Sequence, residues 1–214
     1  MNIRQHSLID NIIVECDKAI RTIIGKPDTT IRSVPGHDLA ETNLTSAEQI
    51  LSMRLMRVNH SGEVAAQALY QGQALTATLP EVRQAMEQAA LEENDHLTWC
   101  QQRVEYLDSH TSILTPLWYI GSFTIGAIAG RVGDKWSLGF VAETEKQVVE
   151  HIDEHLAKIS PDDHKSRAIL EQMKIDELHH CTVAQEAGAS ELPKPIKMAM
   201  GLMSKVMTKS SYWL

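Results

Sequence analysis

Two Glu-x-x-His motifs are the residues in this 214-residue chain best suited to do chemistry: Glu93 with His96, and Glu177 with His180. If both stretches are helical, the i, i+3 spacing places the carboxylate and the imidazole of each pair on one face. A single metal ion could then bind both groups. Either motif alone is a weak signal, because pairs at this spacing also arise by chance among solvated side chains.

Each motif is preceded, at nearly the same distance, by another glutamate. Glu63 lies 30 residues before Glu93, and Glu145 lies 32 residues before Glu177. Two single glutamates and two Glu-x-x-His pairs from four helices are the ligand set of a dinuclear carboxylate centre. Two divalent ions would balance the four carboxylates, and six protein ligands leave coordination positions open for O2. We therefore expect iron, with manganese as the alternative metal.

Several neighbouring residues are weaker candidates. Glu143 rivals Glu145 by spacing, but Glu145 lies better on the apolar stripe of its helix. Tyr70 and His151 lie one to two turns from the single glutamates, where they could touch substrate, support a ligand or only pack. Two aspartates beside the motifs, which could hold imidazole N–H groups from a neighbouring helix or be exposed, are Asp95 and Asp176.

The elements that must position these residues are helices. Apolar residues recur at helical spacing, and nothing from Thr45 onward shows the alternation of a strand. Thr45 and Glu48 have the spacing of a capping box. The four long helices are expected over residues 46–78, 80–108, 137–159 and 160–188. The predicted fold is all-α: a ferritin-like four-helix bundle with one long crossover, an N-terminal accessory helix and a C-terminal amphipathic helix.

The chain is expected to have three parts. Residues 1–44 form a helix from Leu8 to Gly25 and a loop, residues 45–189 form the metal-binding bundle with an apolar crossover at 110–136, and residues 190–214 form a basic amphipathic segment. The crossover holds 20 uncharged residues between His110 and Arg131, which is long enough to span a membrane. A single transmembrane span here would place the two halves of the metal site on opposite sides of the membrane. We therefore expect a crossover that contacts lipid, with packing on the bundle as the alternative.

Within the C-terminal segment, residues 194–214 combine four lysines and no acid with a stripe of apolar residues at helical spacing. This pattern is typical of a helix that binds anionic lipid headgroups or the groove of a partner protein. Its methionines could line a path for a prenyl tail. A contact between subunits is equally compatible with the pattern. The formal charge of −8 argues against nucleic-acid binding. Three scattered cysteines and the lack of a secretory signal favour a reducing cytoplasm.

Together these motifs resemble those of the demethoxyubiquinone hydroxylase family in its bacterial form. The resemblance covers the chain from about Thr45 to its end and extends to the leading helix. The matching stretches are Arg57-Val58-Asn59-His60-Ser61-Gly62-Glu63, Glu93 with His96, Thr144-Glu145-Lys146-Gln147 with His151, and Glu177 with His180. Ile152 stands where many relatives carry an aromatic residue, so no role is transferred to that position.

The resemblance implies that Glu63, Glu93, His96, Glu145, Glu177 and His180 bind two iron ions, ferrous in the resting reduced form. The implied activity is O2-dependent hydroxylation of the ring of a prenylated demethoxyubiquinol, in ubiquinone biosynthesis, at the cytoplasmic face of the cell membrane. No Gly-rich dinucleotide motif identifies the electron donor, for which NADH is a candidate. Other ubiquinone-biosynthesis proteins and a second copy of the chain are candidate partners. The alternatives are a ferritin-like iron-handling or peroxide-scavenging protein and a non-enzymatic scaffold.

Overall fold

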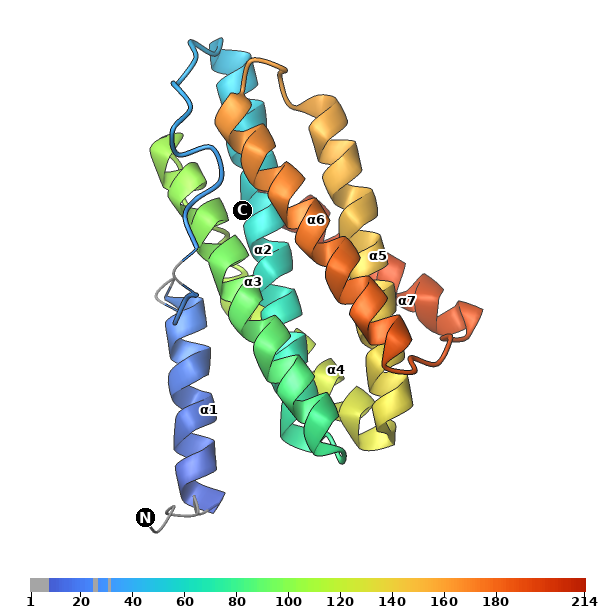
Figure 1. Ribbon diagram of the computed structural model, residues 1–214. Helices are drawn as coiled ribbons and strands as arrows, with labels where there is room; N and C mark the ends of the chain where they lie inside the picture. Colours follow the sequence, from blue (N-terminus) through green and yellow to red (C-terminus); the bar gives the residue numbers. More distant parts are fainter. Residues whose placement is uncertain (1–7, 25–26, 31) are drawn as a thin grey trace.

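The computed structural model describes residues 8–24, 27–30 and 32–214, and these form helices joined by loops, without a strand. The predicted 1–44 segment begins with residues 1–7, which lie outside the described residues. The predicted end of the first helix, Gly25, lies outside them as well. The helices are α1 (Leu8–Ile23), α2 (Ser46–Thr76), α3 (Pro80–Tyr106), α4 (Thr115–Val132), α5 (Asp134–Lys158), α6 (His164–Glu186) and α7 (Lys194–Trp213). Helices α2, α3, α5 and α6 form the bundle (Figure 1). The all-α prediction is confirmed.

Helix α2 begins where the sequence predicts. The Thr45 hydroxyl accepts a hydrogen bond from the backbone amide of Glu48 at 3.3 Å, and the Glu48 carboxylate accepts one from the Thr45 amide at 2.8 Å. This capping box satisfies two amides that a helix start leaves unpaired. The four bundle helices end within two residues of their predicted ends, but α5 begins three residues earlier than expected, at Asp134, and α6 begins four residues later, at His164.

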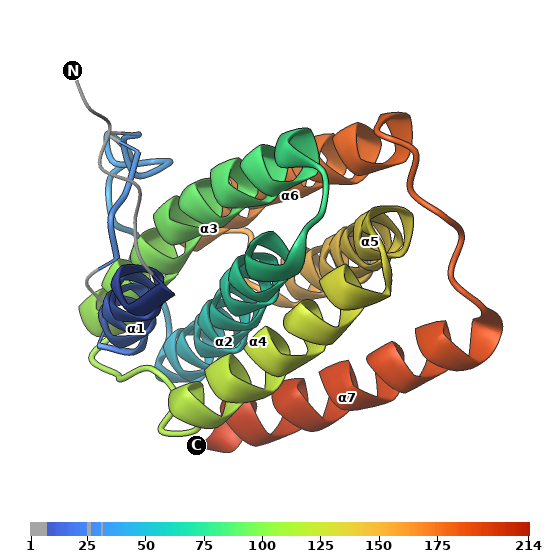
Figure 2. The same cartoon turned by 90° about the horizontal axis from the view of Figure 1, so that it is seen from below.

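The crossover is itself a helix. Helix α4 packs along α2, and Gly133 separates it from α5 with φ of 142°, a conformation that L side chains rarely adopt. Figure 2 shows α4 and α7 on the same side of the bundle, with α3 and α6 on the opposite side. None of the described helices combines the length with the apolar character needed to cross a membrane.

Glycines let α4 approach α2 closely. A Cβ added at Gly126 would lie 2.1 Å from the backbone oxygen of Leu69, and one added at Gly72 would lie 2.2 Å from that of Phe123. These atoms are backbone and cannot move aside as a flexible side chain could. The α2–α4 contact therefore requires small residues at both crossing points.

We expect Gly126→Ala to lower the free energy of unfolding by at least about 2 kcal/mol, because overpacking forces two backbones apart. Gly121→Ala, also on α4, is the matched control, since a Cβ added there meets nothing within 4 Å. That variant should gain up to about 1 kcal/mol from helix propensity. Urea unfolding curves of the two variants measure both effects, and equal stability would contradict the close-approach argument.

Candidate metal centre

The six predicted ligands come from the four bundle helices and converge on its interior. Glu63 lies on α2, Glu145 on α5, and one Glu-x-x-His pair lies on each of α3 and α6. All six side chains are buried: the most exposed is His180 at 7%, and Glu93, His96 and Glu145 are fully enclosed. Carboxylates are almost never buried like this without a partner.

The six side chains form two overlapping clusters. Glu63, Glu93, His96 and Glu177 offer ligand atoms within 4.8 Å of one another, and so do Glu93, Glu145, Glu177 and His180. Glu93 and Glu177 belong to both clusters. Each cluster therefore has one histidine and one glutamate of its own, and the two share a pair of carboxylates that could bridge two ions.

Each histidine turns its Nδ1 atom toward the carboxylates. His96 Nδ1 lies 3.1 Å from Glu93 Oε2, 3.1 Å from Glu177 Oε1 and 3.4 Å from Glu63 Oε2. His180 Nδ1 lies 3.4 Å from oxygens of both Glu93 and Glu177. A ring nitrogen carries at most one hydrogen, so it cannot satisfy three carboxylates by hydrogen bonds. A cation among these atoms could satisfy all of them.

The Nε2 atom of each histidine meets an acid outside the cluster. His96 Nε2 lies 2.9 Å from Asp176 Oδ2 on α6, and His180 Nε2 lies 2.7 Å from Glu92 Oε2 on α3. A carboxylate at Nε2 keeps the hydrogen on that nitrogen and leaves the Nδ1 lone pair free for a metal ion. Asp176 was one of the two aspartates considered for this role. The other, Asp95, accepts hydrogen bonds from Thr30 instead.

Glu92 was missed, although a signal for it exists in the sequence. Glu92 stands directly before Glu93, as Asp176 stands directly before Glu177. In both halves, the acid before the buried glutamate reaches across to the histidine of the opposite helix.

The electrostatics of the two clusters also fit a cation. Burial, with Glu93 nearby, raises the pKa of Glu63 well above its ordinary value, and burial together with Glu177 does the same to the pKa of Glu145. Both carboxylate oxygens of Glu145 are buried without a hydrogen-bond partner. Divalent metal ions are suitable partners for such a donor set of carboxylates and imidazoles. The cluster is therefore compatible with metal binding.

The structure separates the remaining candidates. Glu143 lies outside both clusters, where its carboxylate meets Lys197 Nζ at 3.6 Å and accepts a hydrogen bond from Gln147. Tyr70 is fully buried in the core, and its hydroxyl has no hydrogen-bond partner.

A cavity of about 410 Å³ reaches this group of carboxylates and histidines from one side. Glu63 and Gly62 lie on its wall, helices α2, α4, α5 and α7 enclose it, and its α7 wall includes Met200, Met203 and Met207. Met203 on this wall is 53% exposed, so the cavity lies close to the surface at α7. Its volume is in the range of small-molecule sites.

One wall of the cavity is polar. His155 Nδ1 lies 3.2 Å from Asn59 Oδ1, and His151 Nε2 lies 2.9 Å from the Ser204 hydroxyl. The Asn59 amide nitrogen donates to the Leu55 carbonyl, so its oxygen is the acceptor for His155. Burial lowers the pKa of His155 to about 4, which keeps the ring neutral at neutral pH. These groups can fix the orientation of a polar ring in an apolar cavity.

Comparisons with known proteins identify the family to which the chain is similar. Residues 51–211 match the family model of the ubiquinone biosynthesis protein COQ7. A protein of Nitrosococcus oceani named 3-demethoxyubiquinol 3-hydroxylase is 63% identical over 211 residues, which cover 99% of each chain. A protein of the same name from Nitrosomonas europaea is 52% identical, over 96% of this chain and 99% of its own length. Another from Ectopseudomonas mendocina is 56% identical, over 98% of this chain and 97% of its own length.

Proposed function

Because the chain belongs to the COQ7 family of ubiquinone biosynthesis proteins, we propose that it is a 3-demethoxyubiquinol 3-hydroxylase. The reaction transfers one atom of O2 to the ring of a prenylated quinol and requires two electrons from a reductant. We propose Glu63, Glu93, His96, Glu145, Glu177 and His180 as the ligands of two iron ions. The observation that carries the proposal is that Glu63, a member of one cluster, lines the cavity.

Two iron ions held there would supply the O2 chemistry itself. The residues of the chain bind the substrate and orient it toward the proposed iron site. The apolar walls of α2, α4 and α5 exclude bulk water from the ring. The neutral His155, whose Nδ1 hydrogen is donated to Asn59, presents Nε2 as an acceptor for a ring hydroxyl. His151 lies one turn away and offers a second polar contact.

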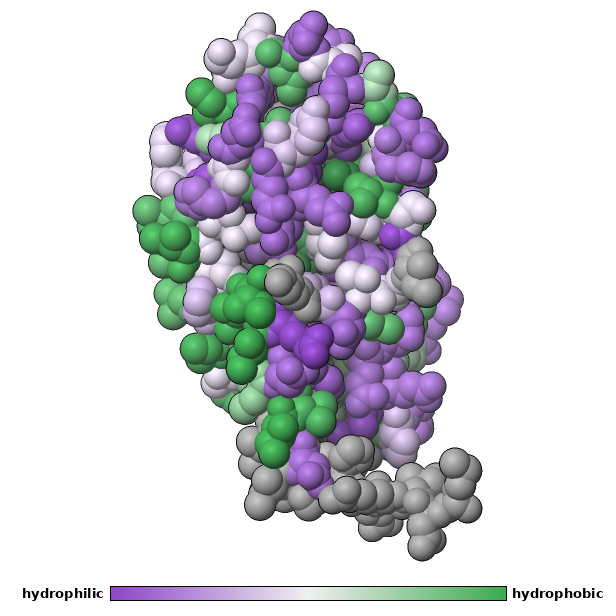
Figure 3. Space-filling view, turned by 90° about the vertical axis from the view of Figure 1, so that its left-hand side faces the viewer, coloured by the Kyte–Doolittle hydropathy of each residue, from purple (hydrophilic) through white to green (hydrophobic). Residues whose placement is uncertain are grey.

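We propose that the face formed by α4 and α7 lies on a membrane. Exposed apolar side chains on this face include Leu117, Ile120, Ile128, Leu202 and Val206. Residues 190–214 carry lysines and a single acid, Glu191, which precedes the helix. Figure 3, viewed from the side of α1, shows hydrophobic side chains along one edge and hydrophilic ones over most of the upper half. A prenyl tail could remain in lipid while its ring enters the cavity between α4 and α7.

The α7 lysines should make membrane binding depend on charge. We expect the protein to float with vesicles that contain phosphatidylglycerol, and to do so less with pure phosphatidylcholine or at high salt. Reversing Lys205 and Lys209 to glutamate should weaken binding at least about tenfold, since each lysine contributes about 1 kcal/mol. Lys174→Glu on α6 is the control and should bind as the wild type does. Equal flotation of the double variant would contradict this orientation.

Iron binding should release protons. The raised pKa values of Glu63 and Glu145 mean that these carboxyl groups are protonated more readily than free ones in the metal-free chain. Since iron and protons compete for the same atoms, affinity for Fe2+ should fall as pH falls, by about tenfold per pH unit for each proton displaced. Calorimetry of Fe2+ binding in two buffers of different ionisation enthalpy measures the number of protons released. A binding heat that does not depend on the buffer would contradict proton release.

The function is tested by metal analysis and turnover together. Protein loaded anaerobically with Fe2+ should bind two ions per chain, and with O2 and NADH it should hydroxylate a short-chain demethoxyquinol, detected by mass spectrometry. A protein that consumes O2 and oxidises its iron without hydroxylating the quinol would instead be an iron-handling protein. A chain that binds no stoichiometric iron would favour the scaffold alternative.

A further inference from the structure

The two clusters resemble each other inside the bundle but differ outside it. The acid behind His96, Asp176, receives hydrogen bonds from Arg32 Nη2 at 2.5 Å and from Gln172 at 2.9 Å. The acid behind His180, Glu92, receives one from Gln88 at 2.7 Å. Among the described residues, no lysine or arginine forms an ion pair with Glu92, and Arg32 acts on this carboxylate only through its charge. The outer support of the two histidines is therefore unequal.

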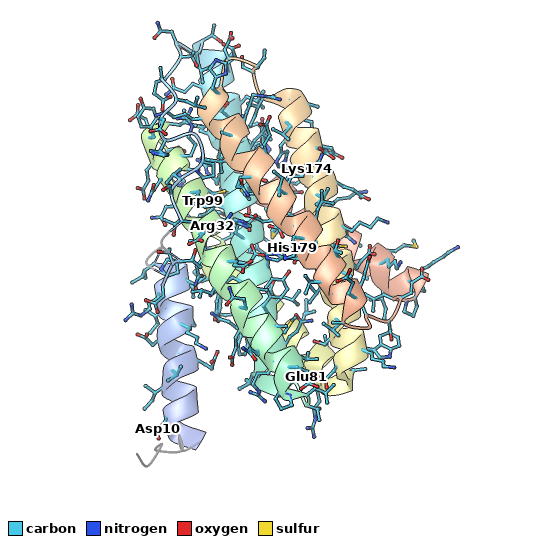
Figure 4. The ribbon with its side chains drawn as sticks, in the orientation of Figure 1. Asp10, Arg32, Glu81, Trp99, Lys174 and His179 are labelled. Atoms are coloured by element: carbon cyan, nitrogen blue, oxygen red, sulfur yellow. The ribbon has the colours of Figure 1, made fainter. Side chains whose placement is uncertain are left out.

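Arg32 reaches His96 by a second route as well. Its guanidinium carbon lies 4.9 Å from the centre of the Trp99 ring, and this ring lies 5.3 Å from that of His96. Trp99 is buried, so it is held in place between the arginine and the imidazole. Figure 4 labels Arg32 and Trp99 beside each other at α3. Arg32 thus contacts two groups that neighbour the His96 ring, the Asp176 carboxylate and the Trp99 ring.

The loop before α2 fixes Arg32 in this position. The Thr30 amide donates to Asp95 Oδ1 at 2.8 Å, and Glu41 further along the loop pairs with Arg103 at 2.9 Å. Asp95 and Arg103 both belong to α3. The loop is therefore anchored to α3 on both sides of Arg32. This loop precedes residues 51–211, which the family model matches.

We propose that Arg32 is a positioning residue that holds His96 through Asp176 and Trp99 and makes the two metal sites unequal, with the ion at His96 held longer. This inference rests on the proposed iron binding. An aligned carboxylate fixes the orientation of a histidine ligand and raises its basicity, and losing such support costs about 10–100-fold in metal affinity. His180 has an acid at Nε2, but no arginine fixes that acid.

The test measures iron release from the full-length protein loaded anaerobically with two Fe2+ ions, using a ferrous chelator in excess. The wild type should release its ions in two phases. Arg32→Ala should accelerate the slow phase about tenfold or more and change the fast phase much less, because Arg32 hydrogen-bonds to Asp176 but acts on Glu92 only through its charge. Asp176→Asn should accelerate the same phase and Glu92→Gln the other, which assigns each phase to its site.

Arg21→Ala is the matched control, because Arg21 also belongs to the N-terminal segment but pairs with Asp17 and Asp28, away from the site. It should change neither phase. Release of both wild-type ions in one phase, an unchanged slow phase in Arg32→Ala, or equal acceleration of both phases would overturn the inference. A wild-type protein that binds no iron would overturn the proposed function first and the inference with it.

Discussion

Glu177→Ala should lose both iron ions and all quinol hydroxylation while remaining a folded helical protein. Glu177 belongs to both clusters, so its removal takes a ligand from each site. Hydroxylation should fall at least about a thousandfold, because the metal supplies the oxidising chemistry. The fold should survive, since removing one of four converging carboxylates relieves repulsion in the metal-free bundle. Iron analysis, turnover and circular dichroism measure the three effects.

Two other variants make this test specific. Glu63→Ala leaves the second cluster complete and should keep about one ion per chain, without turnover. Glu143→Ala removes a carboxylate that pairs with Lys197 outside the site, and it should keep both ions and full activity. Full turnover by Glu177→Ala, or loss of iron by Glu143→Ala, would show that the ligands have been assigned wrongly.

The sequence predicted the bundle because its helix boundaries are set locally. The Thr45 capping box and the proline that opens α3 act within a few residues, so they can be read without knowing the fold. The crossover was different. Its residues are apolar with scattered glycines, and they give no clear amphipathic face. Its helical form was missed because its packing depends on Gly72 and Gly126 meeting across two helices.

The candidate ligands could be predicted for a similar reason. The i, i+3 spacing places a glutamate and a histidine on one face of any helix, and a repeated spacing indicates that two such faces meet. Residues whose role depends on the opposite helix or on a loop were harder to find. Glu92 shows its role only when the two halves are compared. Arg32 lies in an irregular loop whose path is fixed by contacts with α3.

The two sides of the group of six carboxylates and histidines differ in their surroundings. On the side of α3 and α6, the histidines, their outer acids and the N-terminal loop enclose the cluster. On the side of α2 and α5, the cavity brings open space to Glu63. The cavity therefore offers the substrate an approach from the second side, where Gly62 leaves space free.

Gly62→Phe should abolish hydroxylation while both iron ions stay bound. Gly62 lines the cavity directly before Glu63, and a Cβ added there meets nothing within 4 Å. A phenyl ring at this position would occupy the space that the quinol ring needs. Misplacing a substrate by about 1 Å can already cost a hundredfold, so kcat/KM should fall by at least that factor. The helix should gain about 0.5 kcal/mol, because glycine is a poor helix former.

Gly121→Phe provides the matched control for this variant. Gly121 is also a helical glycine with nothing within 4 Å of an added Cβ, but it does not line the cavity. With a short-chain substrate in detergent, Gly121→Phe should keep its kcat/KM, and Gly62→Ala should lose little. Iron content and thermal unfolding separate a blocked cavity from a damaged fold. Wild-type turnover by Gly62→Phe would mean that the quinol ring reaches the metal cluster by another path, because the cavity beside Glu63 would then be dispensable.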